Sequence, residues 1–300
     1  VALLTGHEKG RGTEQEIIEK GEGRGWEAVE EWKLIDHARE RAKTLGKILK
    51  TAGKAPRGKL DMVLGNQVVG LIVHESVGHP YEADRIFGRE AAQAGESFIT
   101  RDMVGRRIGS EVVTVVDDPT LKNSYGYYLY DDEGVPARRR FLMKEGVINE
   151  FLHNRETAAE MGVSSNAAAR SSAFNREPII RMANTFMLPG DQAFDELVEG
   201  VQLGVYMKTF GEWNIDDRRY NMRFVGRECY LIKKGELKGM IRRPILEVTT
   251  PGFYGSVDAL DKSLTFEGAT CGKGDPAQGM PVWHGGPNAR LRGVGLGGRE

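Results

Sequence analysis

Apolar residues recur every three to four positions between Glu27 and Thr51, a spacing typical of an amphipathic helix. Residues 1–24 mix glycine with charged residues and predict a loop, and residues 52–58 predict a Lys/Gly/Pro linker. The apolar stripe of the predicted helix comprises Val29, Trp32, Ile35, Ala38, Ala42, Leu45 and Leu49.

The next segment is strongly apolar. Residues 60–65, "LDMVLG", predict a strand that ends at Gly65, and residues 66–79, "NQVVGLIVHESVGH", predict a buried helix with Asn66 as its N-cap. Because "VVGLIV" is rich in β-branched residues, a strand is the alternative for this stretch.

After about Ile108 the pattern favours β-structure. A strand is expected at 111–118, followed by three strands across 126–152 with turns at 131–134 and 144–146, and by two more around a turn at 234–236. Helices are expected near 154–161 and 191–204, whereas the Gly/Pro-rich residues 268–290 predict irregular structure. The fold class that follows is α+β, with a large, mainly antiparallel, curved sheet, a buried helix and flanking helices.

The chain begins at Val1 rather than at a methionine, and we expect it to be the later part of a longer polypeptide. Residues 1–59 are interpreted as a linker and helix from the end of a preceding domain, and residues 60–300 as the main domain. The 300 residues carry a net charge of −1, which disfavours nucleic acid and anionic membranes as partners. No apolar run approaches the roughly 18 residues of a membrane span, and no secretory signal is evident, so a cytoplasmic location is predicted. Two cysteines argue against a disulfide framework.

The stretch "HESVGH" contains candidate chemistry in His74, Glu75 and His79. Zinc peptidases commonly carry HExxH on a helix, with histidines four residues apart. Five residues on an ideal helix place two side chains about 140° apart, too far for one ion. A π-bulge, or a helix that ends between the histidines, would bring them together. Gly78 tolerates unusual φ/ψ and Pro80 disfavours helical geometry at His79, so we expect the helix to stop at Val77 or Gly78. The alternative is two hydrogen-bonded core histidines.

Further motifs follow in a characteristic order: "PYEAD", "YDDEGVP", "LMKEGVINEFLHNRETA", "IIRMANTFMLPGD" and "TCGKGDPAQGMPVWHGGP". Together with "HESVGH", they resemble the TldD/PmbA family of metalloproteases over about residues 60–290. Members of that family also carry an N-terminal α/β domain, which these residues do not include.

The resemblance implies a zinc peptidase with one Zn²⁺ per chain. It assigns His74, His79 and Cys271 as metal ligands and Glu75 as the general base, so the buried helix would bind the metal. Cys271 would come from a Gly-rich loop, where glycines allow close backbone approach. Cys229 fits a small buried hydrophobic residue better than a ligand.

Five polar residues have weaker assignments. Glu82 and Asp84 match acidic positions of the family motif and are candidates for orienting the imidazole N–H groups, with helix-end charges in solvent as the alternative. His153 and Arg155 are candidates for a substrate channel, with a polar turn as the alternative. His284 is a candidate donor to a tetrahedral oxyanion.

The resemblance also implies that unfolded or flexible peptides bind extended along a sheet edge. It implies a dimer, either of identical chains or with an inactive relative. Two other functions remain open: a non-catalytic peptide-binding or modulator subunit, and a structural zinc site, which would need a fourth protein ligand. An intact Glu75 beside an intact ligand set favours the enzyme.

Overall fold

Two large, mainly antiparallel sheets form the framework of the computed structural model, which describes residues 1–90 and 96–298. The larger sheet has ten strands, with β17 (Val257–Leu260) paired to β20 beside the main path. The path runs in the order β12 (Phe210–Ile215), β13 (Asn221–Gly226), β16 (Pro244–Thr249), β20 (Ala289–Gly298), β4 (Gly58–Leu64), β11 (Leu203–Met207), β14 (Cys229–Lys233), β15 (Glu236–Arg242) and β3 (Gly53–Lys54).

The second sheet has six strands and includes the segment around Cys271. Parallel pairing in the two large sheets is limited, within the described residues, to β4 with β11, β3 with β15 and β10 with β19. The order of the second sheet is β18 (Thr265–Lys273), β19 (Gln278–Gly286), β10 (Asn184–Met187), β5 (Val115–Asp117), β6 (Arg140–Lys144) and β7 (Val147–Ile148). The predicted α+β class is confirmed, with the strands divided between two sheets.

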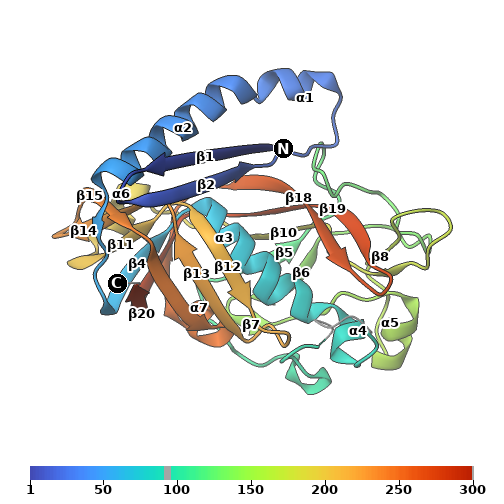
Figure 1. Cartoon of the computed structure of the whole chain (residues 1–300). Coiled ribbons are helices and arrows are strands. Elements are labelled where there is room, and N and C mark those ends of the chain that lie inside the picture. Colours follow the sequence, from blue (N-terminus) through green and yellow to red (C-terminus); the bar gives the residue numbers. More distant parts are fainter. Residues whose placement is uncertain (91–95, 299–300) are drawn as a thin grey trace.

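The helix α3 (Asn66–Val73) lies inside the molecule and runs between the two large sheets (Figure 1). Its residues from Val68 to Val73 are all buried, because a helix that is apolar on every side cannot face water. The predicted cap is wrong. Gly65 is the N-cap, and the Asn66 amide instead donates to Ser263 Oγ and to the carbonyl of Gly286.

A π-helical turn from His74 to Gly78 continues α3, and a 3-10 turn from His79 to Tyr81 follows. The His79 N–H donates to the carbonyl of His74, five residues earlier, as in a π-helix. The predicted helix end at Val77 or Gly78 is therefore wrong: the chain stays helical through His79, and the π-turn brings the histidines together. Gly78 has an ordinary helical φ of −51°, but a Cβ there would lie 1.9 Å from Met182 Sδ. Packing, rather than backbone freedom, accounts for this glycine.

The first 18 residues form a hairpin of β1 (Ala2–Glu8) and β2 (Gly12–Ile18), so the loop predicted for residues 1–24 is wrong there. Two of the buried positions on β2 are Glu14 and Glu16, which pair with arginines. Because glutamates occupy these buried positions, the sequence lacks the alternation of apolar and polar residues that normally indicates a strand. The helix predicted at 27–51 is divided into α1 (Trp26–Glu31) and α2 (Leu34–Thr51), and α2 lies along the hairpin (Figure 1).

Several other predicted boundaries also change. Residues 268–290 are not irregular, because β18, β19 and the start of β20 occupy most of them. The Gly-rich composition misled here, since glycines in strands can mark close backbone approach: a Cβ on Gly268 would lie 2.6 Å from backbone atoms of Gly21. Residues 220–249 contain four strands rather than two, whereas 125–139 is mostly turns.

The remaining elements are short. None of the helices in the described part of the chain is both long enough and apolar enough to cross a bilayer. The remaining short elements are α4 (Ala83–Ile86), a 3-10 turn (Arg101–Met103), α5 (Arg155–Met161), α6 (Phe194–Glu199), α7 (Thr250–Ser256), and the paired strands β8 (Ala169–Arg170) and β9 (Ile179–Ile180).

The close approach of α3 to β19 gives a stability prediction. A Cβ on Gly70 would lie 2.9 Å from the Gly285 Cα, and backbone atoms cannot yield as a flexible side chain can. We expect Gly70→Ala to lower the free energy of unfolding by about 1–3 kcal/mol, measured by chemical denaturation. The control is Gly46→Ala in α2, where nothing lies within 4 Å of the new Cβ. That change should raise stability by about 0.5–1 kcal/mol. Equal effects of the two substitutions would contradict the packing argument.

Candidate metal centre

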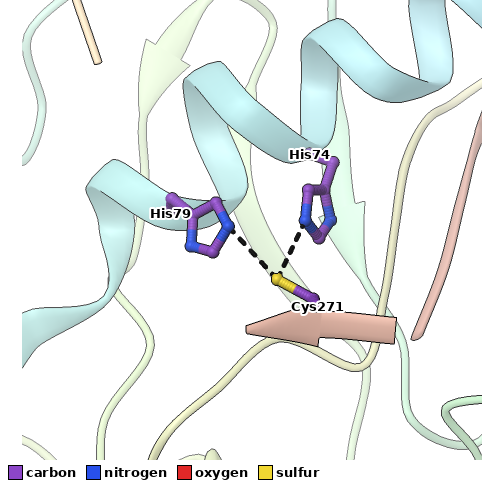
Figure 2. A group of neighbouring side chains, drawn as sticks. All are labelled: His74, His79 and Cys271. Carbon is purple, nitrogen blue, oxygen red and sulfur yellow. Dashed lines mark hydrogen bonds between the residues drawn. The ribbon is translucent and has the colours of Figure 1, made fainter. Parts of the chain in front are cut away.

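Two histidines at the end of α3 meet a cysteine that lies more than 190 residues later in the sequence. The Cys271 Sγ lies 3.2 Å from the Nε2 of His74 and 3.2 Å from the Nε2 of His79. The three candidate ligand atoms lie within 4.8 Å of one another, and all three residues are buried. Figure 2 shows both imidazoles pointing from the helix toward the sulfur on β18. The structure thus brings together the ligand set that the family resemblance implied.

The π-turn and the strand β18 position these groups. The five-residue hydrogen bond places His74 and His79 on one side of the helix, with their ring centroids 4.9 Å apart. Cys271 pairs with Met280 across the β18–β19 ladder, so it lies on a regular strand and not in the predicted loop. A strand fixes the direction of a side chain more firmly than a loop does.

The protonation tendencies of the three residues suit a metal. Burial lowers the pKa of both imidazoles, which favours the neutral form that ligates. Burial opposes ionisation of the Cys271 thiol, but His79 and Arg181 outweigh it, and the pKa of the thiol is lowered. A tetrahedral zinc ion would separate its sulfur and nitrogen ligands by about 3.5 Å, close to the distances here. The residues therefore fit a zinc ion.

Glu82 contacts the ring nitrogen of His79 that faces away from Cys271. Its carboxylate is fully buried and lies 3.1 Å from His79 Nδ1, leaving Nε2 directed at the sulfur. Arg85 Nε donates to Glu82 at 2.8 Å, and Lys273 Nζ lies 3.2 Å away. Although burial raises the pKa of Glu82, these cations and His79 hold it well below its usual value. Glu82 therefore occupies the orienting position predicted for it.

Asp84 contacts Lys273 rather than an imidazole. Both of its carboxylate oxygens accept from Lys273 Nζ at 2.7 Å. Burial raises the pKa of Asp84 despite that cation. Asp84 thus acts on the site through Lys273, two residues after Cys271 on the same face of β18.

Arg181 also holds the strand that carries the sulfur. Its guanidinium is fully buried and donates to the carbonyl of Cys271 at 2.5 Å and to that of Gln278 at 2.9 Å. Sequence reasoning assigned no role to Arg181 or Lys273. Each is a charged residue in an otherwise apolar or Gly-rich stretch of the sequence. That could have indicated a buried cation, which needs hydrogen-bond acceptors around it.

Glu75 lies on the wall of a cavity of about 520 Å³ that the three candidate ligands also line. Its carboxylate pairs with the guanidinium of Arg219, which comes from the turn between β12 and β13 and lines the same cavity. Sequence reasoning missed Arg219 entirely, because 144 residues separate the partners and no motif surrounds the arginine.

His284 lies on β19, directly across the ladder from Glu267, and also lines the cavity. Its ring centroid is 5.8 Å from that of His74. Burial, together with His74, lowers the pKa of His284 to about 3, so its imidazole is neutral. Its proposed contact with a reacting oxyanion stays a prediction.

The other predicted residues do not line this cavity. His153 is buried, and its Nδ1 lies 3.0 Å from Thr157 Oγ1; burial lowers its pKa to about 4. Arg155 is the first residue of α5, and its backbone N–H donates to the carboxylate of Glu133. Cys229 is buried on β14, where burial raises the pKa of its thiol well above the usual value, as expected for a core cysteine.

Comparisons with known proteins place this geometry in a family. The sequence pattern of the PmbA/TldA metallopeptidase C-terminal domain matches residues 57–298. A metalloprotease of Methanocaldococcus jannaschii is 34% identical over 278 residues, covering 93% of this chain and 59% of the relative. A zinc metalloprotease TldD homolog of Saccharolobus solfataricus is 28% identical over 250 residues, covering 82% of this chain and 53% of that protein.

Solved structures share the fold. TldE from Thermococcus kodakarensis superposes with a TM-score of 0.66 at 18% identity, covering 88% of this chain and 56% of that one. A putative modulator of a DNA gyrase from Thermotoga maritima gives a TM-score of 0.65 at 18% identity, covering 87% of this chain and 53% of that one. The chain spans little more than half the length of these proteins. Since the family pattern covers most of its residues, the chain belongs to the PmbA/TldD family of metallopeptidases.

Proposed function

We propose that this chain carries the catalytic centre of a zinc-dependent peptidase. The observation that supports this most directly is the position of Glu75. Glu75 directly follows His74 and lies on the wall of the cavity that the three buried ligand residues also line. A general base in the same cavity as an accessible metal is the arrangement that metal-dependent peptide hydrolysis uses.

Each residue then has a defined role. His74, His79 and Cys271 would hold the zinc, and Glu82 would keep the His79 ring in its ligating orientation. When bound, zinc lowers the pKa of water and polarises a carbonyl. Glu75 accepts a proton from the attacking water and delivers it to the leaving amine.

The proposed substrate is an unfolded or flexible peptide. The cavity is bordered by β12 and β18, the end strands of the two large sheets. The end strand of a sheet can pair with an extended peptide through backbone hydrogen bonds, which select little for sequence. The three ligand residues are each less than a tenth exposed, so only a chain segment free of its own fold could reach them.

The alternative functions have less support. A non-catalytic peptide-binding subunit has no need for Glu75 at a complete ligand cluster. A structural zinc site would be closed by a fourth protein ligand. Among the described residues, the cluster of candidate ligands has three members and borders a cavity, as an open catalytic site does.

Metal content tests the ligand assignment. We expect about one zinc per chain in the wild type and none in Cys271→Ala, because two imidazoles alone hold zinc weakly. The measurement is elemental analysis after dialysis against metal-free buffer. Cys229→Ala is the matched control, since Cys229 is equally buried but lies on β14, and it should keep its zinc. Zinc retained by Cys271→Ala would contradict the ligand assignment.

Glu75→Gln tests the general base. The change keeps the side-chain size but removes the proton acceptor, so we expect hydrolysis of an unstructured peptide to fall by a factor of about 10²–10⁴. Zinc content should not change. Glu236→Gln serves as the control, because Glu236 is exposed and pairs only with Lys238 among the described residues. Full activity of Glu75→Gln would assign the base to another group.

A further inference from the structure

Arg219 is a buried cation in the wall of the metal cavity. It is 8% exposed, and its NH1 nitrogen pairs with Glu75. Its Nε is buried and has no hydrogen-bond partner within the part of the chain that the structure describes. A guanidinium has five N–H donors, so the pair with Glu75 uses only part of its capacity.

The backbone holds Arg219 in an uncommon conformation. Its φ is 63°, in the left-handed region that residues with a Cβ rarely adopt. The Arg219 N–H donates to the Asp216 carbonyl at 2.9 Å, and its own carbonyl accepts from Thr250 Oγ1 at 2.7 Å. The Asp216 carboxylate also accepts from the N–H groups of Tyr220 and Asn221. Such strain persists where the surroundings fix it, often at functional sites.

We propose that Arg219 is a catalytic residue that stabilises the oxyanion formed when the peptide carbonyl is attacked. This inference rests on the proposed peptidase function. Glu75 would take the proton from the attacking water, so a guanidinium in contact with Glu75 lies next to the reacting carbon. Its N–H groups can therefore reach negative charge that develops on the carbonyl oxygen.

The step balances without any further reactant. Water loses a proton to Glu75 as its oxygen bonds to the carbonyl carbon, and the carbonyl π electrons become the oxyanion that Arg219 stabilises. When the carbonyl re-forms, the C–N bond breaks and the proton on Glu75 passes to the amine. The products are a carboxylic acid and an amine.

Two other cavity residues are weaker donors for this role. His284 packs against the ring of His74 rather than Glu75, and an imidazole lacks the permanent charge that makes hydrogen bonds from a charged donor about twice as strong. Arg227 also lines the cavity, but it forms an ion pair with Glu16, at 4.0 Å, rather than with Glu75. Arg219 combines permanent charge with direct contact to the proposed base.

The test compares Arg219→Gln and Arg219→Lys with the wild type, all loaded with zinc. Arg218→Gln is the matched control, since Arg218 occupies the same turn with a side chain that is 63% exposed. The measurements are zinc content, kcat/KM on peptides with free and amidated C-termini, and the affinity of acetyl-Ala-Ala-Ala-Ala-amide with a phosphinic group replacing the central amide. That compound imitates the tetrahedral intermediate and carries no terminal carboxylate.

We expect Arg219→Gln to keep its zinc and to lose a factor of about 10²–10³ in kcat/KM on both peptides. The affinity for the phosphinic peptide should fall by a similar factor, because loss of a transition-state contact lowers kcat/KM and the affinity for a transition-state analogue alike. Arg219→Lys should recover part of each loss, and Arg218→Gln should resemble the wild type.

Three results would overturn the proposal: unchanged phosphinic-peptide affinity in Arg219→Gln, a loss restricted to peptides with a free C-terminal carboxylate, or loss of zinc from both Arg219 variants. If the wild type cuts no peptide but binds the phosphinic peptide through Arg219, the peptidase function and the catalytic role of Arg219 both fail, and Arg219 is left as an anion-binding residue. If the wild type neither cuts peptides nor binds the phosphinic peptide, both proposals fail.

Discussion

One backbone hydrogen bond, from the His79 N–H to the His74 carbonyl, underlies the arrangement of the site. It widens the helix by one residue per turn at this point, so two imidazoles five residues apart face the same sulfur. With ordinary helical bonding, the rings would point about 140° apart. The wider turn is accommodated because Gly78 leaves room for Met182. Glu75, the next residue after His74, faces the same cavity.

The end of this helix is also held by buried charge. The side chains of Glu82, Lys273 and Arg181 are fully buried. They link the turn after His79 to the carbonyl of Cys271 and to the residue two positions after it. Removing one member of such a group leaves an uncompensated charge, which costs far more than an exposed ion pair contributes. The network therefore does more than add stability. It fixes the distance between a helix and a strand that are separated by almost 200 residues in the sequence.

Much of this could be predicted from the sequence, for identifiable reasons. The apolar run before His74 predicted a buried helix, with a strand as the alternative, and binding of one metal ion by both His74 and His79 called for a π-turn or a helix end. The third ligand, Cys271, followed only from the family resemblance, because no local pattern connects it with the histidines. Arg219 could not be predicted at all, since its role depends on how a turn packs against α3. The hairpin β1–β2 was missed because Glu14 and Glu16 occupy inward positions that usually hold apolar residues.

The end of this hairpin and the residues after it form part of the wall of the cavity. Ile17 and Glu19 line it, and the carbonyl of Gly21 accepts from the indole N–H of Trp283, 2.6 Å away. These residues precede the stretch that matches the family pattern, which begins at residue 57. One wall of the chamber is thus supplied by a part of the chain separate from the residues proposed to do the chemistry. Such a division lets substitutions near the N-terminus change the shape of the cavity while the proposed metal ligands on the helix and strand stay unchanged.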